Sequence, residues 1–300
     1  MMADSFARIA IAGTGLIGGS FALAARRVLP GVYIAGWDRA EVLDRALALG
    51  IIDAGHSELR EAVAAADLIY IALPVQDAID RLPEIMRHAS PDALITDASS
   101  TKRAICAAAA KCFVNGARFV GGHPMAGNER SGLGSADAML FRGSSYALVE
   151  AAETGEASST AKDLVGRSDK RLTRLLDLIA AIGARPMWMD AATHDRTVAV
   201  VSHLPQLLAV ALAGVVAAET QERDLPLALA GRGLRDALRL AGSPYDVWRD
   251  IVLTNTDNLD AALARTSQAI EYLRANLRKR PLETEFARAN EVYRILRELQ

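Results

Sequence analysis

One short segment limits the fold of this chain more than any other: residues 13–18 read Gly-Thr-Gly-Leu-Ile-Gly, a glycine-rich turn between an apolar run and a helical pattern. Gly13 allows a tight turn, Gly15 lets the backbone approach a pyrophosphate, and Gly18 lets the helix pack closely on the strand. A phosphate bound there would lie at the positive end of a helix that starts near Leu16. The segment predicts dinucleotide binding, although a purely structural turn has the same pattern.

Asp38 adds a second feature of such a site, because it follows Gly18 by twenty residues at the end of the next predicted strand. A carboxylate there accepts hydrogen bonds from the adenosine ribose and repels a 2′-phosphate, which favours NAD over NADP. Arg39 is either a solvated surface residue, which we prefer, or a cradle for that phosphate. We therefore expect a cofactor site made by Gly13, Gly15, Leu16, Ile17, Gly18, Asp38 and Arg39.

The first half of the chain alternates short apolar runs with helical stretches. The runs with strand character are Arg8–Ala12, Tyr33–Trp37, Leu68–Leu73 and Leu94–Asp97. The helical stretches are Leu16–Arg27, Glu41–Leu49, Leu59–Ala65, Asp77–His88 and Lys102–Cys112. Strands separated by helices at this spacing predict parallel strands with right-handed crossovers. We expect an α/β fold with a Rossmann-type doubly wound parallel sheet.

The second half of the chain has a different pattern. Ala151–Lys162 is small, polar and without periodicity, which predicts an exposed loop, and Arg185–Met189 suits a last strand. Beyond residue 190 the apolar residues repeat at helical spacing almost to the C-terminus. We expect a dinucleotide-binding domain over residues 1–190 and an all-helical domain for substrate binding and dimerisation over residues 191–300.

Composition argues against several classes of protein. The 34 Lys and Arg residues balance 36 Asp and Glu residues, so a nucleic-acid binder that works through counterion release is not expected. The longest apolar run, Leu207–Ala218, is too short to cross a bilayer, and Met1–Arg8 lacks the apolar core of a signal peptide. Cys106 and Cys112 fall on different helix faces, which favours neither a disulfide nor a metal pair. We expect a cytoplasmic protein without a metal, membrane or nucleic-acid partner.

His123 stands in the most suggestive position of the histidines. It follows the apolar run Arg118–Val120 and two glycines, and Pro124 comes next. We expect it to end a strand in a rigid loop at the carboxyl edge of the sheet, where open α/β folds bind ligands. A histidine there is either an acid or base for catalysis or a residue satisfied by backbone hydrogen bonds.

The residues around His123 carry a family resemblance. Gly121–Gly127 reads Gly-Gly-His-Pro-Met-Ala-Gly and is followed by Glu129, Ser131 and Gly132, which resembles the signature of prephenate and arogenate (cyclohexadienyl) dehydrogenases. Further motifs fall in the order found in that family, from residue 8 to about 250: Gly13–Ser20, Asp97–Lys102, His194-Asp195, Ser202–Pro205 and Trp248–Asp250.

The resemblance implies an NAD-dependent oxidation in tyrosine biosynthesis: prephenate to 4-hydroxyphenylpyruvate, or arogenate to tyrosine, with loss of CO₂. It assigns His123 as the base that takes the C4 hydroxyl proton, which is typically worth 10²–10⁴-fold in rate. It assigns Ser100 to a bridge between that hydroxyl and the nicotinamide. Ser100 also suits an N-cap for a helix beginning near Thr101, and it can serve both purposes.

Substrate recognition is expected from the second domain. Arg232, Arg235 and Arg239 share one face if their segment is helical, and for the first two we prefer a solvated stripe. The resemblance assigns Arg239 to a substrate carboxylate, and His203 and Gln206 to substrate binding. Many prephenate-preferring members carry a histidine where this chain has Gln206, so prephenate, arogenate or both stay open as substrates.

Two alternatives stay open beside this assignment. The first is another two-domain dehydrogenase with a helical C-terminal domain, of the β-hydroxyacid or pyrroline-carboxylate reductase type, which often uses a lysine on its long helix. The second is a dinucleotide sensor or scaffold without catalysis. The family resemblance further implies a homodimer through the helical domain, although packing within one chain also explains the apolar stripes. The residues before the first strand and after the helical domain leave no room for a chorismate mutase segment or a regulatory module, so we expect a monofunctional core enzyme.

Overall fold

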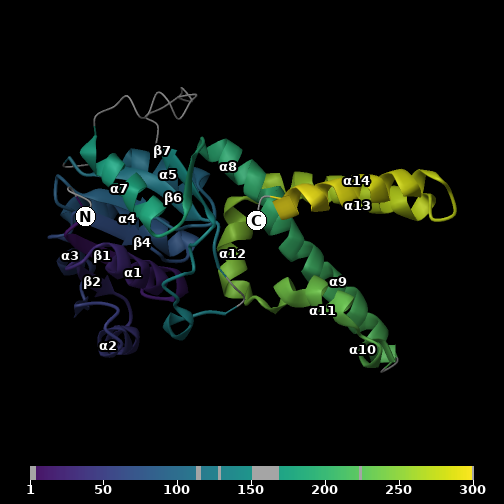
Figure 1. The fold of residues 1–300 in the computed structure, drawn as a ribbon, viewed down its shortest axis with the longest axis horizontal. Helices are drawn as coiled ribbons and strands as arrows, with labels where there is room; N and C mark the ends of the chain where they lie inside the picture. The colour runs from purple at the N-terminus through teal and green to yellow at the C-terminus, as the bar shows by residue number, and fades with distance from the viewer. Residues whose placement is uncertain (1–4, 113–115, 128–129, 151–168, 223–224, 299–300) are drawn as a thin grey trace.

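The structure is a computed structural model that describes residues 5–112, 116–127, 130–150, 169–222 and 225–298. It has a sheet region covered by helices and, beside it, a helical region from which two arms extend (Figure 1). The first arm contains α9 to α11 and the second contains α13 and α14. The expected loop Ala151–Lys162 and the motif residue Glu129 lie outside the described residues.

The described residues form one sheet with the strand order β3-β2-β1-β4-β5-β6-β7-β8. Its strands are β1 (Arg8–Ala12), β2 (Tyr33–Trp37), β3 (Ala54–His56), β4 (Leu68–Ile71), β5 (Leu94–Asp97), β6 (Arg118–Pro124), β7 (Ser145–Glu150) and β8 (Arg185–Trp188). Neighbours from β3 to β6 are parallel, whereas β6 and β7 are antiparallel. The expected Rossmann-type fold class is confirmed, with β7 and β8 running opposite to the parallel strands.

Helices cover both faces of this sheet, so the central strands are buried on both sides. Successive side chains of β4 alternate between two apolar clusters: Tyr70 packs on the side of α1 (Leu16–Val28) and α7 (Lys170–Ala181), and Ile71 packs on the other. The remaining helices of this region are α2 (Ala40–Ala48), α3 (Leu59–Val63), α4 (Val75–His88), α5 (Arg103–Lys111) and the 3₁₀ turn Leu133–Ser135.

The strand that carries His123 is longer than the sequence predicts. β6 continues to Pro124, and His123 pairs with Ala147 of β7 in antiparallel register. The expectation of a loop at this position was wrong, because the hydrogen-bonding partner is a distant strand that the local glycine pattern does not reveal. The short strand β3, which contains a glycine, also lacks a local signal.

Two residues separate β8 from the helical region. It contains α8 (Ala191–Val198), a π-helical turn η2 (Ala199–His203), α9 (Leu204–Glu222), α10 (Leu225–Ala228), α11 (Arg232–Leu238), a 3₁₀ turn η3 (Arg239–Gly242), α12 (Tyr245–Thr254), α13 (Thr256–Ala275) and α14 (Pro281–Glu298). His203 follows His194 by nine positions, about two and a half turns of a regular α-helix, which would place them on opposite faces. The wider η2 turn changes this offset, and both histidines are buried.

The continuous helix Ala191–Thr220 is long and apolar enough to cross a membrane, with a mean hydropathy of 1.9 in its most apolar window. The run Leu207–Ala218, too short by itself, is part of this longer helix. Length and composition alone are weak evidence for a membrane-spanning helix, because the core helix of a soluble protein can have the same length and hydropathy. Only 28% of that window is buried, so the helix presents an apolar surface.

Candidate active site

The glycine turn lies at the switch point of the sheet, between β1 and β4. Gly13 has φ of 93°, and a Cβ at Gly18 would stand 1.9 Å from the carbonyl oxygen of Gly13, so both positions require glycine. A Cβ at Gly15, in contrast, would meet nothing within 4 Å. Gly15 therefore faces open space at the N-terminus of α1, where no side chain caps the helix. This arrangement fits a bound pyrophosphate.

Asp38 is held beside this turn. Its Oδ2 accepts hydrogen bonds from the backbone N–H of Thr14 (2.7 Å) and from the Thr14 hydroxyl (3.1 Å). Its Oδ1 accepts from the N–H of Arg39 (2.7 Å), whose side chain is exposed. Leu16 and Ile17 form the first turn of α1 and are half-buried. The predicted cofactor residues thus surround one end of the sheet, with a carboxylate fixed where a ribose would bind.

A buried ion pair fixes the segment that precedes His123. Lys102 is fully buried, and its Nζ forms a short ion pair with Asp97 and donates to the carbonyl oxygen of Gly122 (2.7 Å). Asp97 in turn accepts from the N–H groups of Gly122 and Ser99, both at 2.9 Å. Buried charges are tolerated when their hydrogen-bonding capacity is satisfied in this way. The pair joins the carboxyl ends of β5 and β6 and thereby places His123.

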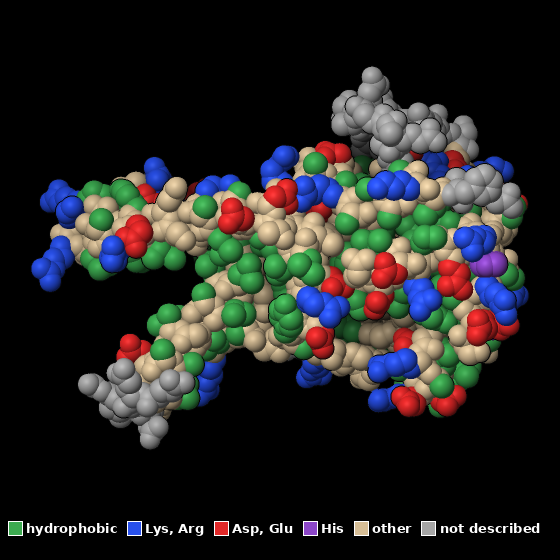
Figure 2. All heavy atoms as spheres, turned by 180° about the vertical axis from the view of Figure 1, so that it is seen from behind, with side chains coloured by type: hydrophobic (Ala, Val, Ile, Leu, Met, Phe, Trp, Pro, Cys, Tyr) green, Lys and Arg blue, Asp and Glu red, His purple; other side chains and the backbone are tan. Residues whose placement is uncertain are grey.

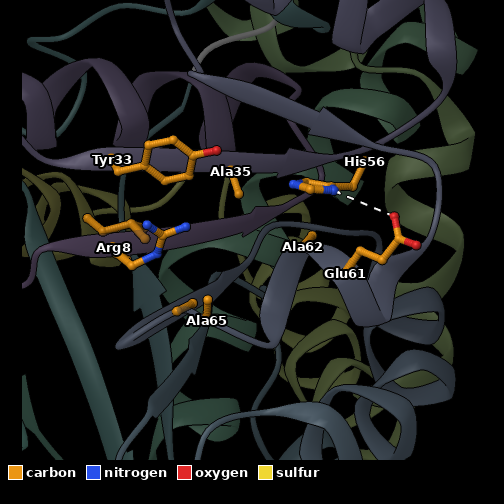
Figure 3. A pocket seen from close by; sticks show the side chains of 9 residues that line it. Arg8, Tyr33, Ala35, His56, Glu61, Ala62 and Ala65 are labelled. Carbon is orange, nitrogen blue, oxygen red and sulfur yellow. Dashed lines mark ion pairs between the residues drawn. The ribbon is translucent and has the colours of Figure 1, made fainter.

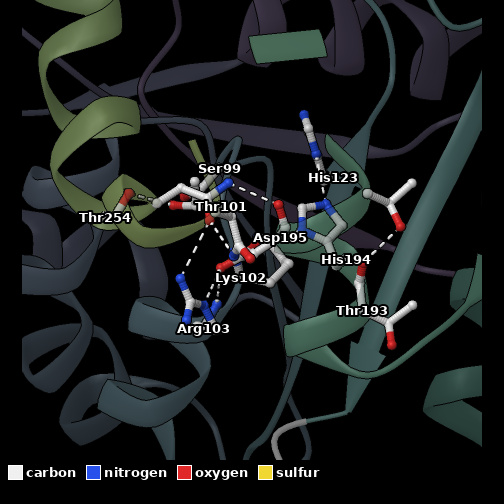
Figure 4. Close-up of polar contacts among 12 residues, drawn as sticks. Ser99, Thr101, Lys102, Arg103, His123, Thr193, His194, Asp195 and Thr254 are labelled. Carbon is white, nitrogen blue, oxygen red and sulfur yellow. Dashed lines mark hydrogen bonds and ion pairs between the residues drawn. The ribbon is translucent and has the colours of Figure 1, made fainter. Parts of the chain in front are cut away.

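His123 is part of a chain of buried side chains that crosses between the two regions (Figure 4). Its Nδ1 lies 2.9 Å from Nε2 of His194, and Nδ1 of His194 lies 2.8 Å from Oδ1 of Asp195. His194 and Asp195 are 1% and 0% exposed, and both come from α8. Figure 4 shows the other side of the His123 ring directed away from His194.

Asp195 is also bound to the beginning of α5. It accepts hydrogen bonds from the N–H groups of Lys102 (2.7 Å) and Arg103 (3.0 Å) and from the guanidinium of Arg103 (3.2 Å). Burial raises the pKa of Asp195, but the hydrogen bonds from His194 and from these backbone N–H groups outweigh it, so the pKa lies below its ordinary value. The carboxylate is therefore ionised at neutral pH.

This contact changes the expected role of Ser100. The helix starts at Arg103 with Lys102 at its N-cap, so Ser100 is not the cap. The prediction of a cap failed because Asp195, distant in sequence, binds the free N–H groups instead. Ser100 is half-buried in the segment between β5 and α5. That placement leaves its hydroxyl for the predicted contact with hydroxyl and nicotinamide, which stays a prediction.

His123 is neutral near physiological pH. Burial, reinforced by the nearby His194, Lys102 and His203, holds its pKa well below the ordinary value. A neutral imidazole has one nitrogen that accepts a proton. Because Asp195 accepts from Nδ1–H of His194, the Nε2 of His194 is an acceptor for Nδ1–H of His123. Nε2 of His123 is then the nitrogen with the lone pair, as a general base requires.

His203 has the opposite tautomer. The side-chain Nδ2 of Asn255 donates to the carbonyl oxygen of Asp195 (2.8 Å). The same nitrogen lies 3.3 Å from Nδ1 of His203, which therefore accepts its second hydrogen. Nε2 then carries the proton, and among the described residues this buried N–H has no hydrogen-bond partner. Burial lowers the pKa of His203 to about 4. A buried, unsatisfied N–H donor fits the predicted substrate-binding role.

The other predicted substrate residues lie outside the hydrogen-bond network of His123, His194 and Asp195. Gln206 is buried one turn after His203, on the same helix. Arg239 is exposed and begins η3 rather than extending α11, so it does not continue the helical face of Arg232 and Arg235. The role of Arg239 stays a prediction.

The sequence shows His194, Asp195, Asp97 and Lys102 only as parts of motifs. It does not predict that His194 contacts His123 or that the other three bind the residues around this pair. The available signal was a histidine next to an acid at the start of a helix. Asn255 had no such signal, since its role depends on how α13 packs. Among the described residues, no cluster of three or more histidine, cysteine or acidic side chains is suited to hold a metal.

A separate hollow lies over β1, β2 and α3 and shares no residue with this site (Figure 3). Arg8 stacks on Tyr33 at 4.3 Å, and His56 lies 3.7 Å from Glu61 within it. Nothing there resembles the catalytic arrangement around His123.

A nucleotide-binding α/β domain with a neutral, buried histidine, followed by a helical domain, is the arrangement of a two-domain dehydrogenase. Family models agree: residues 21–173 match the nucleotide-binding domain of prephenate dehydrogenase, and residues 190–291 match its dimerization domain. The chain belongs to the prephenate dehydrogenase family. The family and enzyme class expected from the sequence are confirmed.

Individual relatives agree with this assignment. The chain is 34% identical over 252 residues to prephenate dehydrogenase of Lactococcus lactis, covering 83% of this chain and 65% of that protein. It is 32% identical to prephenate dehydrogenase of Bacillus subtilis over 93% of this chain and 72% of that protein. It is also 32% identical to cyclohexadienyl dehydrogenase of Zymomonas mobilis over 85% of this chain and 83% of that protein.

Solved structures give the same result. Prephenate dehydrogenase from Aquifex aeolicus, in complex with hydroxyphenyl propionate and NAD⁺, matches with a TM-score of 0.82 and 30% identity over 99% of each chain. Arogenate dehydrogenase from Synechocystis matches with a TM-score of 0.69 and 26% identity over 97% of this chain and 96% of that one. The expected cofactor, NAD, is supported by the nucleotide-binding domain and by the Aquifex complex.

Proposed function

We propose that this protein catalyses the NAD-dependent oxidative decarboxylation of prephenate to 4-hydroxyphenylpyruvate in tyrosine biosynthesis. The observation that carries the proposal is the buried, neutral His123, whose accepting nitrogen faces away from His194 on the same edge of the sheet as the glycine turn. The names of the relatives from Lactococcus and Bacillus support the substrate class.

The chemistry requires a base at the C4 hydroxyl of the substrate. Nε2 of His123 accepts the hydroxyl proton while the hydride leaves C4, and NAD⁺, when bound, supplies the hydride acceptor. Loss of CO₂ from C1 then leaves an electron pair on the ring oxygen as a phenolate. The phenolate takes the proton back from His123, so no net proton is released. Formation of the aromatic ring makes the overall reaction irreversible.

Binding of the substrate is assigned to the helical region. The buried Nε2–H of His203 is suited to donate to a substrate oxygen, and Arg239 is suited to a carboxylate. We further propose NAD rather than NADP as the cofactor, supported by the fixed carboxylate of Asp38 and the exposed side chain of Arg39.

Arogenate is the second candidate substrate, and Gln206 is the observation that favours it. An uncharged, buried amide accepts a hydrogen bond from the ammonium group of an alanyl side chain, whereas a protonated histidine would repel it. The names of the Zymomonas relative, a cyclohexadienyl dehydrogenase, and of the Synechocystis structure, an arogenate dehydrogenase, support this second candidate.

We propose a homodimer formed through the helical region. Figure 2 shows apolar side chains on the surface of the arms. The exposed ones include Val210 and Val215 of α9 and Ile270 of α13. A second copy would cover these faces, and it would also explain the apolar surface of the long helix without a membrane. A cytoplasmic location and the absence of nucleic-acid partners stay predictions from composition.

The experiment is an assay of NADH formation with prephenate and arogenate side by side, each with NAD⁺ and with NADP⁺. We expect turnover with prephenate and NAD⁺ and a lower kcat/KM with NADP⁺. A higher kcat/KM with arogenate would replace the proposed substrate by the second candidate. No NADH with either compound, from protein that binds NAD⁺, would contradict the proposed function.

A further inference from the structure

The chain of contacts behind His123 has the form of a base with its own orienting groups. We propose that His194 and Asp195 are positioning residues that hold His123 in the Nδ1–H tautomer and share the positive charge that it acquires during the reaction. The inference rests on the proposed function for its chemical step and on the hydrogen bonds of the described residues for its geometry.

The direction of the hydrogen bonds is set at the carboxylate end. Asp195 is ionised and accepts only, so Nδ1 of His194 must donate to it and Nε2 of His194 must accept from His123. If His194 carried a second proton, its Nε2–H would donate to Nδ1 of His123 and the outer nitrogen of His123 would hold a proton. His123 could then not accept one from the substrate. The productive state therefore requires both histidines to be neutral.

The same chain has a use after the proton is taken. Between oxidation of the alcohol and reprotonation of the phenolate, one proton is held on the enzyme as an imidazolium. Nδ1–H of His123 can then shift toward Nε2 of His194, which places the charge next to the carboxylate of Asp195. Asp195 already accepts from Lys102, Arg103 and His194, so it orients the charge and does not take the proton.

The charged and titratable groups around His123 come from both regions of the molecule. They are Asp97 of β5, Lys102 before α5, His194 and Asp195 of α8, and His203 of η2. Asp97 and Lys102 neutralise each other, which leaves Asp195 as the carboxylate that faces the histidine pair. Because Asp195 also binds the N-terminus of α5, the tautomer of His123 depends on the docking of the helical region.

Asp195→Asn tests the proposal most sharply. Oδ2 of Asp195 accepts twice from Arg103, which favours the amide oxygen at that position. The amide N–H₂ then takes the place of Oδ1, faces Nδ1 of His194 and reverses both histidine tautomers. We expect kcat to fall by at least about 10²-fold, as when the carboxylate of a Ser-His-Asp triad is changed to an amide. Cofactor affinity and melting temperature report whether the variant is folded.

His194→Gln separates positioning from charge sharing. Its side-chain oxygen still accepts from Nδ1–H of His123 but cannot carry a proton. We expect a loss of about tenfold in kcat and a shift of the acidic limb of the kcat/KM profile to lower pH, because the link to Asp195 is broken. A purely structural role would lower the rate equally at every pH. Asp190→Asn, at the N-cap of the same helix, is the control and should keep kcat within about twofold.

A readout without substrate completes the test. Nitrogen-15 chemical shifts of the histidines in the cofactor-free protein should show His123 protonated at Nδ1 in the wild type and at Nε2 in Asp195→Asn. Unchanged tautomers, or variants with wild-type kcat and pH profile, would overturn the inference. Because the tautomers are measured without turnover, a wild type that oxidises neither candidate substrate would contradict the proposed function and leave the tautomer result to decide the positioning role.

Discussion

The sheet region and the helical region bury their apolar side chains very differently. In the sheet region both faces of the sheet are covered, and strands such as β4 and β5 are buried throughout. Of 24 large hydrophobic side chains exposed among the described residues, 20 lie between residues 191 and 298. The first region has a complete core of its own, whereas the second leaves apolar faces that one chain does not cover.

This difference separates the tasks of the two regions. The sheet region can hold a nucleotide with parts that come from one stretch of sequence, the glycine turn and Asp38. The helical region supplies His194, Asp195 and His203, which matter only when it is docked against β5 and β6. The cofactor site is therefore made by residues close together in the sequence, whereas the environment of the base, His123, depends on contacts between distant parts of the chain.

The largest expected effect concerns the glycine turn and tests whether the sheet region depends on its own packing. Gly18→Ala places a Cβ 1.9 Å from the carbonyl oxygen of Gly13, so we expect a loss of roughly 3 kcal/mol or more in the free energy of unfolding. Gly15→Ala, whose Cβ would meet nothing, should keep the melting temperature and lose NAD affinity. Equal stability losses in both variants, measured by thermal unfolding, would contradict this account.

The next effect concerns the exposed face of the helical region. Val215 is 63% exposed on α9, and Val215→Asp should raise the dimer dissociation constant by about 100-fold, or about 2.7 kcal/mol, because a charge is buried when a second copy covers this face. Leu49→Asp is the matched control, since Leu49 is 56% exposed on the sheet region. Sedimentation at several concentrations measures both. Dissociation of the dimer in Leu49→Asp but not in Val215→Asp would contradict the proposal that the helical region forms the dimer interface.

The buried histidine of the helical region predicts a dependence of stability on pH. The pKa of His203 is about 4 when folded and about 6.5 when unfolded, so the unfolded state binds more protons between these values. Stability is therefore retained above about pH 6.5 and falls as the pH falls toward 4, by about 2 kcal/mol at pH 5 from this group alone. Denaturant unfolding of the wild type and His203→Asn at pH 7 and pH 5, at one protein concentration, should show a smaller drop in the variant. Identical drops would show that His203 does not contribute.

The smallest expected effect concerns the division of binding between the regions. Arg239→Gln should raise the substrate KM by about tenfold, about 1.4 kcal/mol, because a carboxylate loses its guanidinium partner. The KM for NAD⁺, which belongs to the sheet region, should not change. Arg235→Gln is the neighbouring control on α11. An unchanged substrate KM in Arg239→Gln would remove this residue from the site.

The sequence predicts what depends on neighbouring residues. The strands Arg8–Ala12, Tyr33–Trp37 and Leu94–Asp97 have the bounds that their apolar runs indicate, because buried parallel strands read as continuous apolar segments. β3 is short and has no such run. β7 does have an apolar run at residues 146–149, but its antiparallel pairing with β6 is not revealed by any local pattern.

The site divides in the same way. His123 could be found from its glycines and proline and from the family signature around it. Its contact with His194, 71 residues further along the chain, depends on how α8 docks against the sheet. The hydrogen bonds from the start of α5 to Asp195 depend on the same docking. Single-sequence reasoning supplies candidates for such a network but not the tautomers that decide which nitrogen is the base.

The most direct measurement is single-turnover NADH formation by His123→Asn, compared with the wild type at saturating prephenate and NAD⁺. Asparagine fills a similar space but cannot accept a proton at neutral pH, so the rate should fall at least about 10²-fold while the dissociation constant of NAD⁺ stays within about twofold. A variant that forms NADH at nearly the wild-type rate would contradict the assignment of His123 as the base.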